Sequence, residues 1–162
     1  MSSATVPAVT EIVHRLAAHG LTVATAESLT AGLIVSTLVT VPGASAVVRG
    51  GLVTYATDLK AELAGVDREL LARSGAVDPE VARQMALGAA RVCRADVGVS
   101  CTGVAGPDPQ DGKPVGLVYL GLASPDGVVV QERRFEGDRA AIRLATVNAA
   151  IDLLGRGAGE PA

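Results

Sequence analysis

The pattern of apolar and polar positions predicts helices and strands that alternate along most of the chain. Apolar residues with helical spacing predict helices, and short apolar runs bounded by turn residues predict strands. The predicted helices cover about residues 6–19, 33–40, 57–65, 68–73, 79–93 and 139–154. The predicted strands cover about residues 21–25, 47–55, 96–102, 115–124 and 128–135. This order predicts an α/β fold, a three-layer α/β/α sandwich with a mixed, mostly parallel sheet.

Several of these boundaries carry local signals of their own. Asp78-Pro79-Glu80 is typical of a helix start, and Gly20 is typical of a helix end. Pro125-Asp126-Gly127 predicts a hairpin between the last two strands. No internal repeat or linker divides the chain, so we expect one domain over residues 1–162, with residues 155–162 as a flexible tail.

Composition and charge argue against several classes of protein. The chain is 49% apolar but has no Trp, one Phe and two Tyr, and its net charge is −3. Few aromatic rings and an acidic balance argue against a nucleic-acid partner. No apolar stretch reaches the ~20 residues that span a bilayer, and the N-terminus lacks the features of a signal peptide. We therefore expect a cytoplasmic protein with no membrane partner.

The cysteines and histidines of the chain give little support for metal-binding or redox chemistry. Cys93 and Cys101 do not form a CxxC pair, and Cys101 lies in an apolar run typical of a buried thiol. His14 and His19 both lie on the first predicted helix. We expect no metal site and no cofactor.

The stretch from Thr25 to Gly32 joins the first predicted strand to a helix and contains the first candidate for chemistry. Such a junction places Ser28 at or just before a helix N-terminus, where unpaired N–H groups and the helix dipole suit an anion or a developing oxyanion. The position resembles the nucleophile turn of hydrolases, although the G-x-S-x-G pattern is absent. Taken alone, capping of the helix by Ser28 or Thr30 is the simpler interpretation.

Tyr55 and Lys60 form a second candidate cluster after the second predicted strand. A serine nucleophile needs a base, and without a plausible catalytic histidine a lysine or tyrosine would have to serve. Burial would lower the pKa of Lys60 and make it a usable base, while Tyr55 could relay the proton or hold a leaving group. The alternative is a solvated Lys60 and a Tyr55 in the core or at a rim. The chain contains neither a G-x-G-x-x-G motif after the first strand nor a G-x-x-x-x-G-K-[ST] motif, which argues against the dinucleotide-binding and P-loop folds.

Two further clusters could complete a site at the carboxyl ends of the strands. The stretch from Thr102 to Pro107 includes Gly103 and Gly106, whose backbone can approach a ligand closely, although a plain tight turn explains these glycines almost as well. Arg139 and Arg143 are four residues apart and share one helix face, which suits either an anionic ligand or a solvated surface.

These stretches occur in an order that resembles one known family. They are Ala26-Glu27-Ser28-x-Thr30-x-Gly32, Val41-Pro42-Gly43-x-Ser45, Gly51-x-Val53-Thr54-Tyr55, Lys60, Gly75-Ala76-Val77, Thr102-Gly103-x-Ala105-Gly106-Pro107, Lys113-Pro114-Val115-Gly116 and Gly137-Asp138-Arg139-x-x-Ile142-Arg143. From about Val13 to Leu154 the chain resembles the CinA C-terminal-domain family, the nicotinamide-nucleotide amidohydrolases. Larger members carry an N-terminal molybdopterin-binding-like domain, so this chain resembles the stand-alone form.

The resemblance implies hydrolysis of the amide of nicotinamide mononucleotide to nicotinate mononucleotide and ammonia, without a cofactor. It implies that Ser28 is the nucleophile and that Tyr55 and Lys60 activate it. It also implies a homodimer. The substrate-binding residues that it implies are Glu27, Thr30, Gly32, Thr102, Gly103, Gly106, Arg139 and Arg143, with the two arginines holding the phosphate.

Two features depart from the family pattern. Leu29 and Ala31 stand where the family usually has Cys and Gly, and residues 108–112 replace a more glycine-rich loop. A function from another class, a non-catalytic module that binds a nucleotide or a protein partner, would keep the glycine-rich loops and the arginines. Such a module would not need Ser28, Tyr55 and Lys60 together, so their joint presence favours an enzyme.

Overall fold

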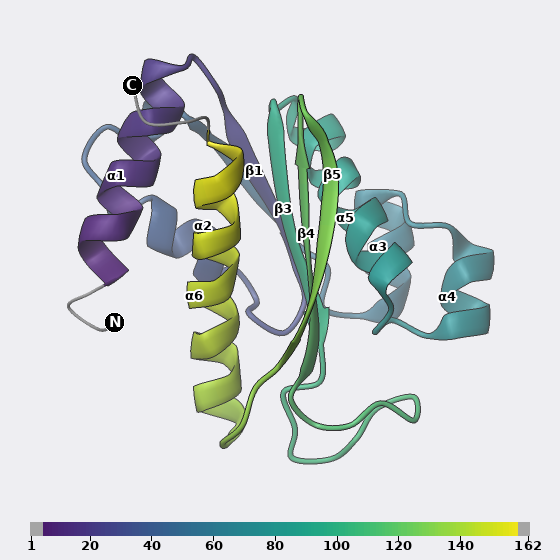
Figure 1. Ribbon diagram of the computed structural model, residues 1–162. Helices are drawn as coiled ribbons and strands as arrows, with labels where there is room; N and C mark the ends of the chain where they lie inside the picture. The colour runs from purple at the N-terminus through teal and green to yellow at the C-terminus, as the bar shows by residue number, and fades with distance from the viewer. Residues whose placement is uncertain (1–4, 159–162) are drawn as a thin grey trace.

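The structure, a computed structural model, describes residues 5–158 and consists of a five-stranded sheet with helices on both faces (Figure 1). The strands are β1 (Val23–Glu27), β2 (Val48–Val53), β3 (Val97–Gly103), β4 (Leu117–Ser124) and β5 (Gly127–Arg134). The helices are α1 (Thr5–Ala18), α2 (Leu33–Leu38), α3 (Thr57–Ala64), α4 (Arg68–Ser74), α5 (Pro79–Cys93) and α6 (Arg139–Gly157), with a short 3₁₀ helix, η1 (Ala44–Ala46).

The sheet has the strand order β2-β1-β3-β4-β5. Strand β1 pairs in parallel with β2 and β3, whereas β4 is antiparallel to both β3 and β5. The expected α/β fold with a mixed sheet is confirmed. The sheet is less parallel than expected, because two of its four pairings are antiparallel. A hairpin at Pro125-Asp126 produces one of these pairings, and the long loop after β3 produces the other.

Helices α1, α2 and α6 cover one face of the sheet, and α3, α4 and α5 cover the other (Figure 1). Small residues allow α5 to lie very close to the strands. A side chain at Gly98 would place its Cβ 2.0 Å from the carbonyl oxygen of Ala86, and one at Gly121 would place it 2.5 Å from that of Ala82. The shortage of aromatic residues therefore reflects close helix–sheet packing, which needs small side chains on the sheet.

The last helix is longer than the sequence pattern predicts. Helix α6 continues through Gly157, so the expected tail is wrong for residues 155–157, and residues 159–162 lie outside the described residues. The helix starts where expected, because the Asp138 carboxylate accepts a hydrogen bond from the Ala141 N–H at 2.8 Å. At its other end, Arg15 of α1 donates to the carbonyl of Gly155 at 2.6 Å, and this contact holds the last turn against α1.

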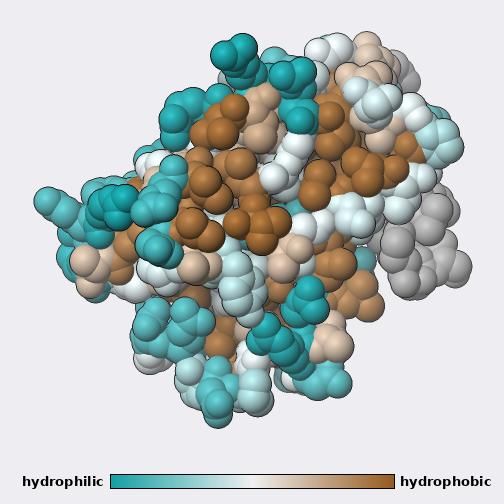
Figure 2. Space-filling view, turned by 180° about the vertical axis from the view of Figure 1, so that it is seen from behind, coloured by the Kyte–Doolittle hydropathy of each residue, from teal (hydrophilic) through white to brown (hydrophobic). Residues whose placement is uncertain are grey.

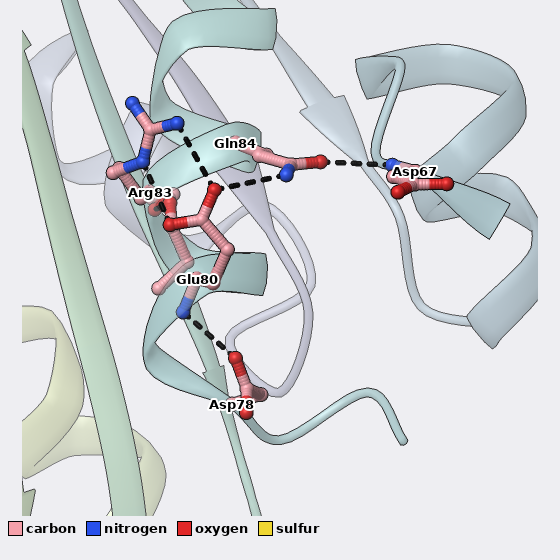
Figure 3. A network of polar contacts seen from close by, with 7 residues as sticks. Asp67, Asp78, Glu80, Arg83 and Gln84 are labelled. Carbon is pink, nitrogen blue, oxygen red and sulfur yellow. Dashed lines mark hydrogen bonds and ion pairs between the residues drawn. The ribbon is translucent and has the colours of Figure 1, made fainter. Parts of the chain in front are cut away.

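A polar network joins the start of α4 to α5 (Figure 3). Asp78 caps α5, accepting from the Glu80 N–H at 2.8 Å as the sequence predicts. Glu80 then accepts from Arg83 and Gln84, and the Gln84 amide oxygen accepts from the Asp67 N–H at 2.8 Å. The bonds to Arg83 and Gln84 lower the pKa of Glu80. The Glu80–Arg83 pair is partly exposed to solvent, so this network orders the surface more than it stabilises the fold.

Hydrophobic side chains gather on the face that lies behind the view of Figure 1, where the edge strand β2 runs (Figure 2). Val39, after α2, and Val53, at the end of β2, are among the exposed apolar residues. A single chain does not test the expected homodimer, which stays a prediction. Across residues 5–158, none of the helices has the length and apolar character needed to span a membrane.

Candidate active site

Ser28 and Lys60 lie in hydrogen-bond contact at the carboxyl ends of two parallel neighbours, β1 and β2. Ser28 follows β1 directly, and Lys60 lies on α3, the helix that follows β2. The Lys60 Nζ lies 3.0 Å from the Ser28 Oγ and donates to the main-chain carbonyls of Thr54 at 2.8 Å and Tyr55 at 3.4 Å. Lys60 is only 1% exposed, so its interpretation as a solvated surface lysine is wrong.

Burial gives Lys60 the proton affinity of a base. Desolvation lowers the pKa of Lys60 from 10.5 to about 8, against smaller raising effects of Cys101 and Asp58. Within the described chain Lys60 forms no salt bridge. A neutral amine has two N–H groups and one lone pair. The two carbonyls accept the N–H groups, which leaves the lone pair for the hydroxyl proton of Ser28.

Glu27 is buried behind the turn that contains Ser28 and stabilises this turn by hydrogen bonds. Its carboxylate is fully buried and accepts five hydrogen bonds of 2.7–3.0 Å. The donors are the hydroxyls of Thr25 and Thr30 and the N–H groups of Gly32, Ile34 and Val35. Glu27 therefore satisfies the free N–H groups at the start of α2.

This arrangement corrects the expected position of Ser28. Helix α2 begins at Leu33 rather than beside Ser28, and neither Ser28 nor Thr30 caps it. The N-terminus of α2 is bonded to Glu27 and is not available for a developing oxyanion. Glu27, Thr30 and Gly32 lie behind Ser28 and do not line the cavity, although the resemblance implies that they bind substrate.

A cavity of about 110 Å³ opens beside Ser28 and Lys60. Its lining consists of Ser28, Leu29, Tyr55, Lys60, Ala76, Val77, Thr102, Gly103, Val104, Ala105, Gly106, Asp108, Gln110 and Arg139. It is smaller than a typical pocket for a complete drug-sized ligand, so it suits one group of a substrate rather than a whole nucleotide. Seven of the residues that the sequence singles out thus meet around one cavity, as strand ends in an open α/β sheet allow.

Tyr55 and Arg139 lie together at the rim of this cavity. The Arg139 guanidinium donates to the Tyr55 hydroxyl and to the carbonyl of Gly106, both at 2.7 Å. Tyr55 is 54% exposed, and it meets Lys60 through its main-chain carbonyl rather than through its hydroxyl. Its phenol therefore has no direct route for a proton between Lys60 and Ser28 within the described residues.

Arg143 contacts a different part of the protein from Arg139, although both arginines lie on one face of α6. It donates to the main-chain carbonyls of Leu29 at 2.8 Å and Thr30 at 3.3 Å. It does not line the cavity. The two arginines were expected to act together on a phosphate, and the structure brings only Arg139 to the cavity.

Backbone N–H groups supply possible donors for a negative charge in the cavity. Among residues 5–158, the N–H groups of Leu29, Ala105 and Gly106 have no hydrogen-bond acceptor, and all three residues line the cavity. Sequence reasoning proposed no role for the backbone of Leu29 or Ala105. The sequence signal that could have found them is their position in two of the family motifs, the one around Ser28 and the one after Thr102. Side-chain identity gives no such signal, because free N–H groups arise where the backbone is irregular.

The remaining polar residues of the site are structural in their contacts. The Thr102 hydroxyl donates to the carbonyl of Ala76 at 2.7 Å and so joins β3 to the segment after α4. Cys101 is buried within 3.1 Å of the Thr30 hydroxyl, and burial raises the pKa of its thiol to about 11.

Asp108 and Gln110 line the cavity, although the sequence motifs did not predict them as site residues and only their 108–112 loop was noted. No three His, Cys, Asp or Glu residues of the described chain are placed to hold a metal ion.

Comparison with known proteins yields consistent matches. A CinA-like protein from Frankia casuarinae is 51% identical over 135 residues, which are 83% of this chain and 31% of that protein. A CinA-like protein from Geobacter sulfurreducens is 51% identical over 138 residues, which are 85% of this chain and 33% of that protein. The chain thus spans about a third of the length of these curated relatives.

Solved structures extend the match to the whole fold. The crystal structure of the competence/damage inducible protein CihA from Agrobacterium tumefaciens has a TM-score of 0.91 and 41% identity, covering 95% of each chain. A CinA superfamily protein from Escherichia coli also has a TM-score of 0.91, with 29% identity over 96% of this chain and 93% of that one. The family model of the CinA C-terminal domain matches residues 6–157. The chain therefore belongs to the CinA C-terminal domain family.

Proposed function

We propose that this protein hydrolyses the carboxamide of nicotinamide mononucleotide, giving nicotinate mononucleotide and ammonia. The CinA family is linked to this deamidase activity. The observation that carries the proposal is the buried Lys60 Nζ at 3.0 Å from the Ser28 Oγ. Burying a lysine without a carboxylate partner costs stability, and a module that only binds a nucleotide gains nothing from that cost.

In the proposed reaction, the Ser28 oxygen attacks the amide carbon while Lys60 accepts the hydroxyl proton. The resulting tetrahedral intermediate carries a negative oxygen. The free N–H groups of Leu29, Ala105 and Gly106 are the donors available to stabilise it. Collapse breaks the carbon–nitrogen bond, and Lys60 returns the proton to the departing ammonia. Water then hydrolyses the acyl-serine, with Lys60 again accepting a proton and returning it to Ser28.

The nucleotide part of the substrate would extend beyond the cavity toward Arg139. The small cavity suits the pyridine ring and its amide, and Arg139 lies at the rim. A guanidinium can pair with a phosphate through two parallel hydrogen bonds. Arg139 would exchange its bonds to Tyr55 and Gly106 for bonds to the phosphate. Because the whole chain has a net charge of −3, this short-range contact would provide the attraction for the anionic substrate.

The test is ammonia release from nicotinamide mononucleotide by the purified protein, with the nucleotide product identified by chromatography. We expect equal amounts of ammonia and nicotinate mononucleotide. Ser28→Ala should lower kcat at least about 10³-fold, since removal of a nucleophile costs orders of magnitude. Ser36→Ala, which changes an exposed serine on α2, is the matched control. The proposal is wrong if the wild type releases no ammonia or if the two variants are equally active.

A further inference from the structure

We propose that Arg143 is a positioning residue that fixes the backbone of the turn at residues 28–32 and so aims Ser28 at Lys60. This inference rests on the proposed function only in taking Ser28 as the nucleophile. It assigns Arg143 a role that differs from the phosphate binding implied by the resemblance.

Within residues 5–158, the hydrogen bonds of Arg143 both go to the main chain of this turn. Its Nε donates to the carbonyl of Leu29 at 2.8 Å, and its Nη2 donates to the carbonyl of Thr30 at 3.3 Å. These bonds join residues 113 and 114 positions apart in the sequence. The rigid guanidinium fork suits two consecutive carbonyls, whereas an ammonium has no such fixed geometry.

The turn has a backbone that needs support from outside. Ala31 has φ of +49°, which is uncommon for a residue with a side chain, and Gly32 follows with φ of +97°. Such conformations persist when surrounding contacts over-determine them. Glu27 accepts from the Thr30 hydroxyl and the Gly32 N–H, and Arg143 donates to the carbonyls of Leu29 and Thr30, so the turn is held by two separate side chains.

Peptide planarity connects these carbonyls to the reacting groups. The Ser28 carbonyl accepts from the Ala31 N–H at 3.0 Å, and this bond fixes the peptide plane that contains the Leu29 N–H. Arg143 fixes the next plane through the Leu29 carbonyl. With both planes fixed, the backbone of Leu29 has one conformation. The direction of its free N–H, the donor beside Ser28, is then determined as well.

Labelling of Ser28 by a small fluorophosphonate tests this inference without any nucleotide. The rate of labelling reports how well Ser28 is positioned and activated. We expect Arg143→Ala to slow both labelling and kcat by about 10²-fold, because a misplacement of about 1 Å is enough for such a loss. The KM for nicotinamide mononucleotide should change little. Guanidinium ion at low millimolar concentration should restore part of the labelling rate, and Arg143→Lys should be intermediate.

Arg156→Ala is the matched control, since Arg156 is an exposed arginine on the last turn of the same helix. It should label and turn over like the wild type. Two results would overturn the inference: unchanged labelling in Arg143→Ala with a raised KM, which indicates a phosphate contact, or slowed labelling that guanidinium ion does not restore. Wild-type labelling without ammonia release would reject the proposed substrate but leave this test valid. Absence of labelling in the wild type would reject both.

Discussion

Replacing Lys60 by methionine should lower kcat strongly and change the pH dependence of the protein's stability. Methionine has a similar length and no charge, so the substitution keeps the volume of the side chain and removes the amine. General-base assistance is worth about 10²–10⁴ in rate, and kcat should fall by this factor. The change in stability measures whether burial really lowers the pKa of Lys60.

The magnitude follows from the pKa itself. Lowering it from 10.5 to about 8 corresponds to a penalty of about 3 kcal/mol for the charged form, at about 1.4 kcal/mol per tenfold change in proton affinity. Below pH 8 the folded and unfolded wild-type chains both hold the proton, so the whole penalty is present. Between pH 8 and 10.5 the unfolded chain holds the proton more strongly, so wild-type stability rises with pH. A methionine at position 60 does not titrate, so it adds no such pH dependence to the free energy of unfolding.

The assay is urea unfolding of both proteins at pH 7 and pH 10. We expect the free energy of unfolding of Lys60→Met, relative to wild type, to be about 2 kcal/mol more favourable at pH 7 than at pH 10. The absolute difference also includes about 1–3 kcal/mol for the carbonyl of Thr54, which loses its donor. The difference between the two pH values removes that contribution, because it is the same at both.

Lys113→Met is the matched control, since Lys113 lies in the loop between β3 and β4 and is only partly buried. Its effect on the free energy of unfolding should be similar at both pH values. A Lys60→Met effect that is equally independent of pH would refute the reasoning. Lys60 would then have the same proton affinity in the folded and unfolded chains, and burial would not have brought its pKa close enough to neutral pH for it to serve as a base.

Two further predictions concern activity. The kcat of the wild type should rise with pH through an apparent pKa of about 8 and then level off, because Lys60 must lose its proton to accept one from Ser28; a flat profile from pH 6 to 10 would contradict this. Arg139→Ala should raise the KM for nicotinamide mononucleotide about tenfold to a hundredfold, for loss of about 1.5–3 kcal/mol, and leave turnover of nicotinamide riboside nearly unchanged. Equal losses on both substrates would assign Arg139 to the fold instead.

Local sequence signals determined the elements and most of their boundaries. Asp78 caps the helix that it was expected to cap, and Asp138 caps the last helix at its expected start, because a capping bond joins residues only two or three positions apart. The alternation of helices and strands predicted the layers, since each apolar face must be buried against another. The strand ends in turn predicted which loops would meet. That is why seven of the proposed site residues lie around one cavity.

Only the tertiary structure decided what these residues contact. The sequence left Lys60 open as either a base or a solvated lysine, and the fold buried its amine beside a serine 32 positions away. Glu27 looked like a ligand for substrate, and the folded turn made it the cap of α2. Arg139 and Arg143 looked equivalent, and their neighbours separated them into a rim residue and a residue that holds the turn. Capping and periodicity depend on spacing along the chain, whereas burial and partner choice depend on segments that only the fold brings together.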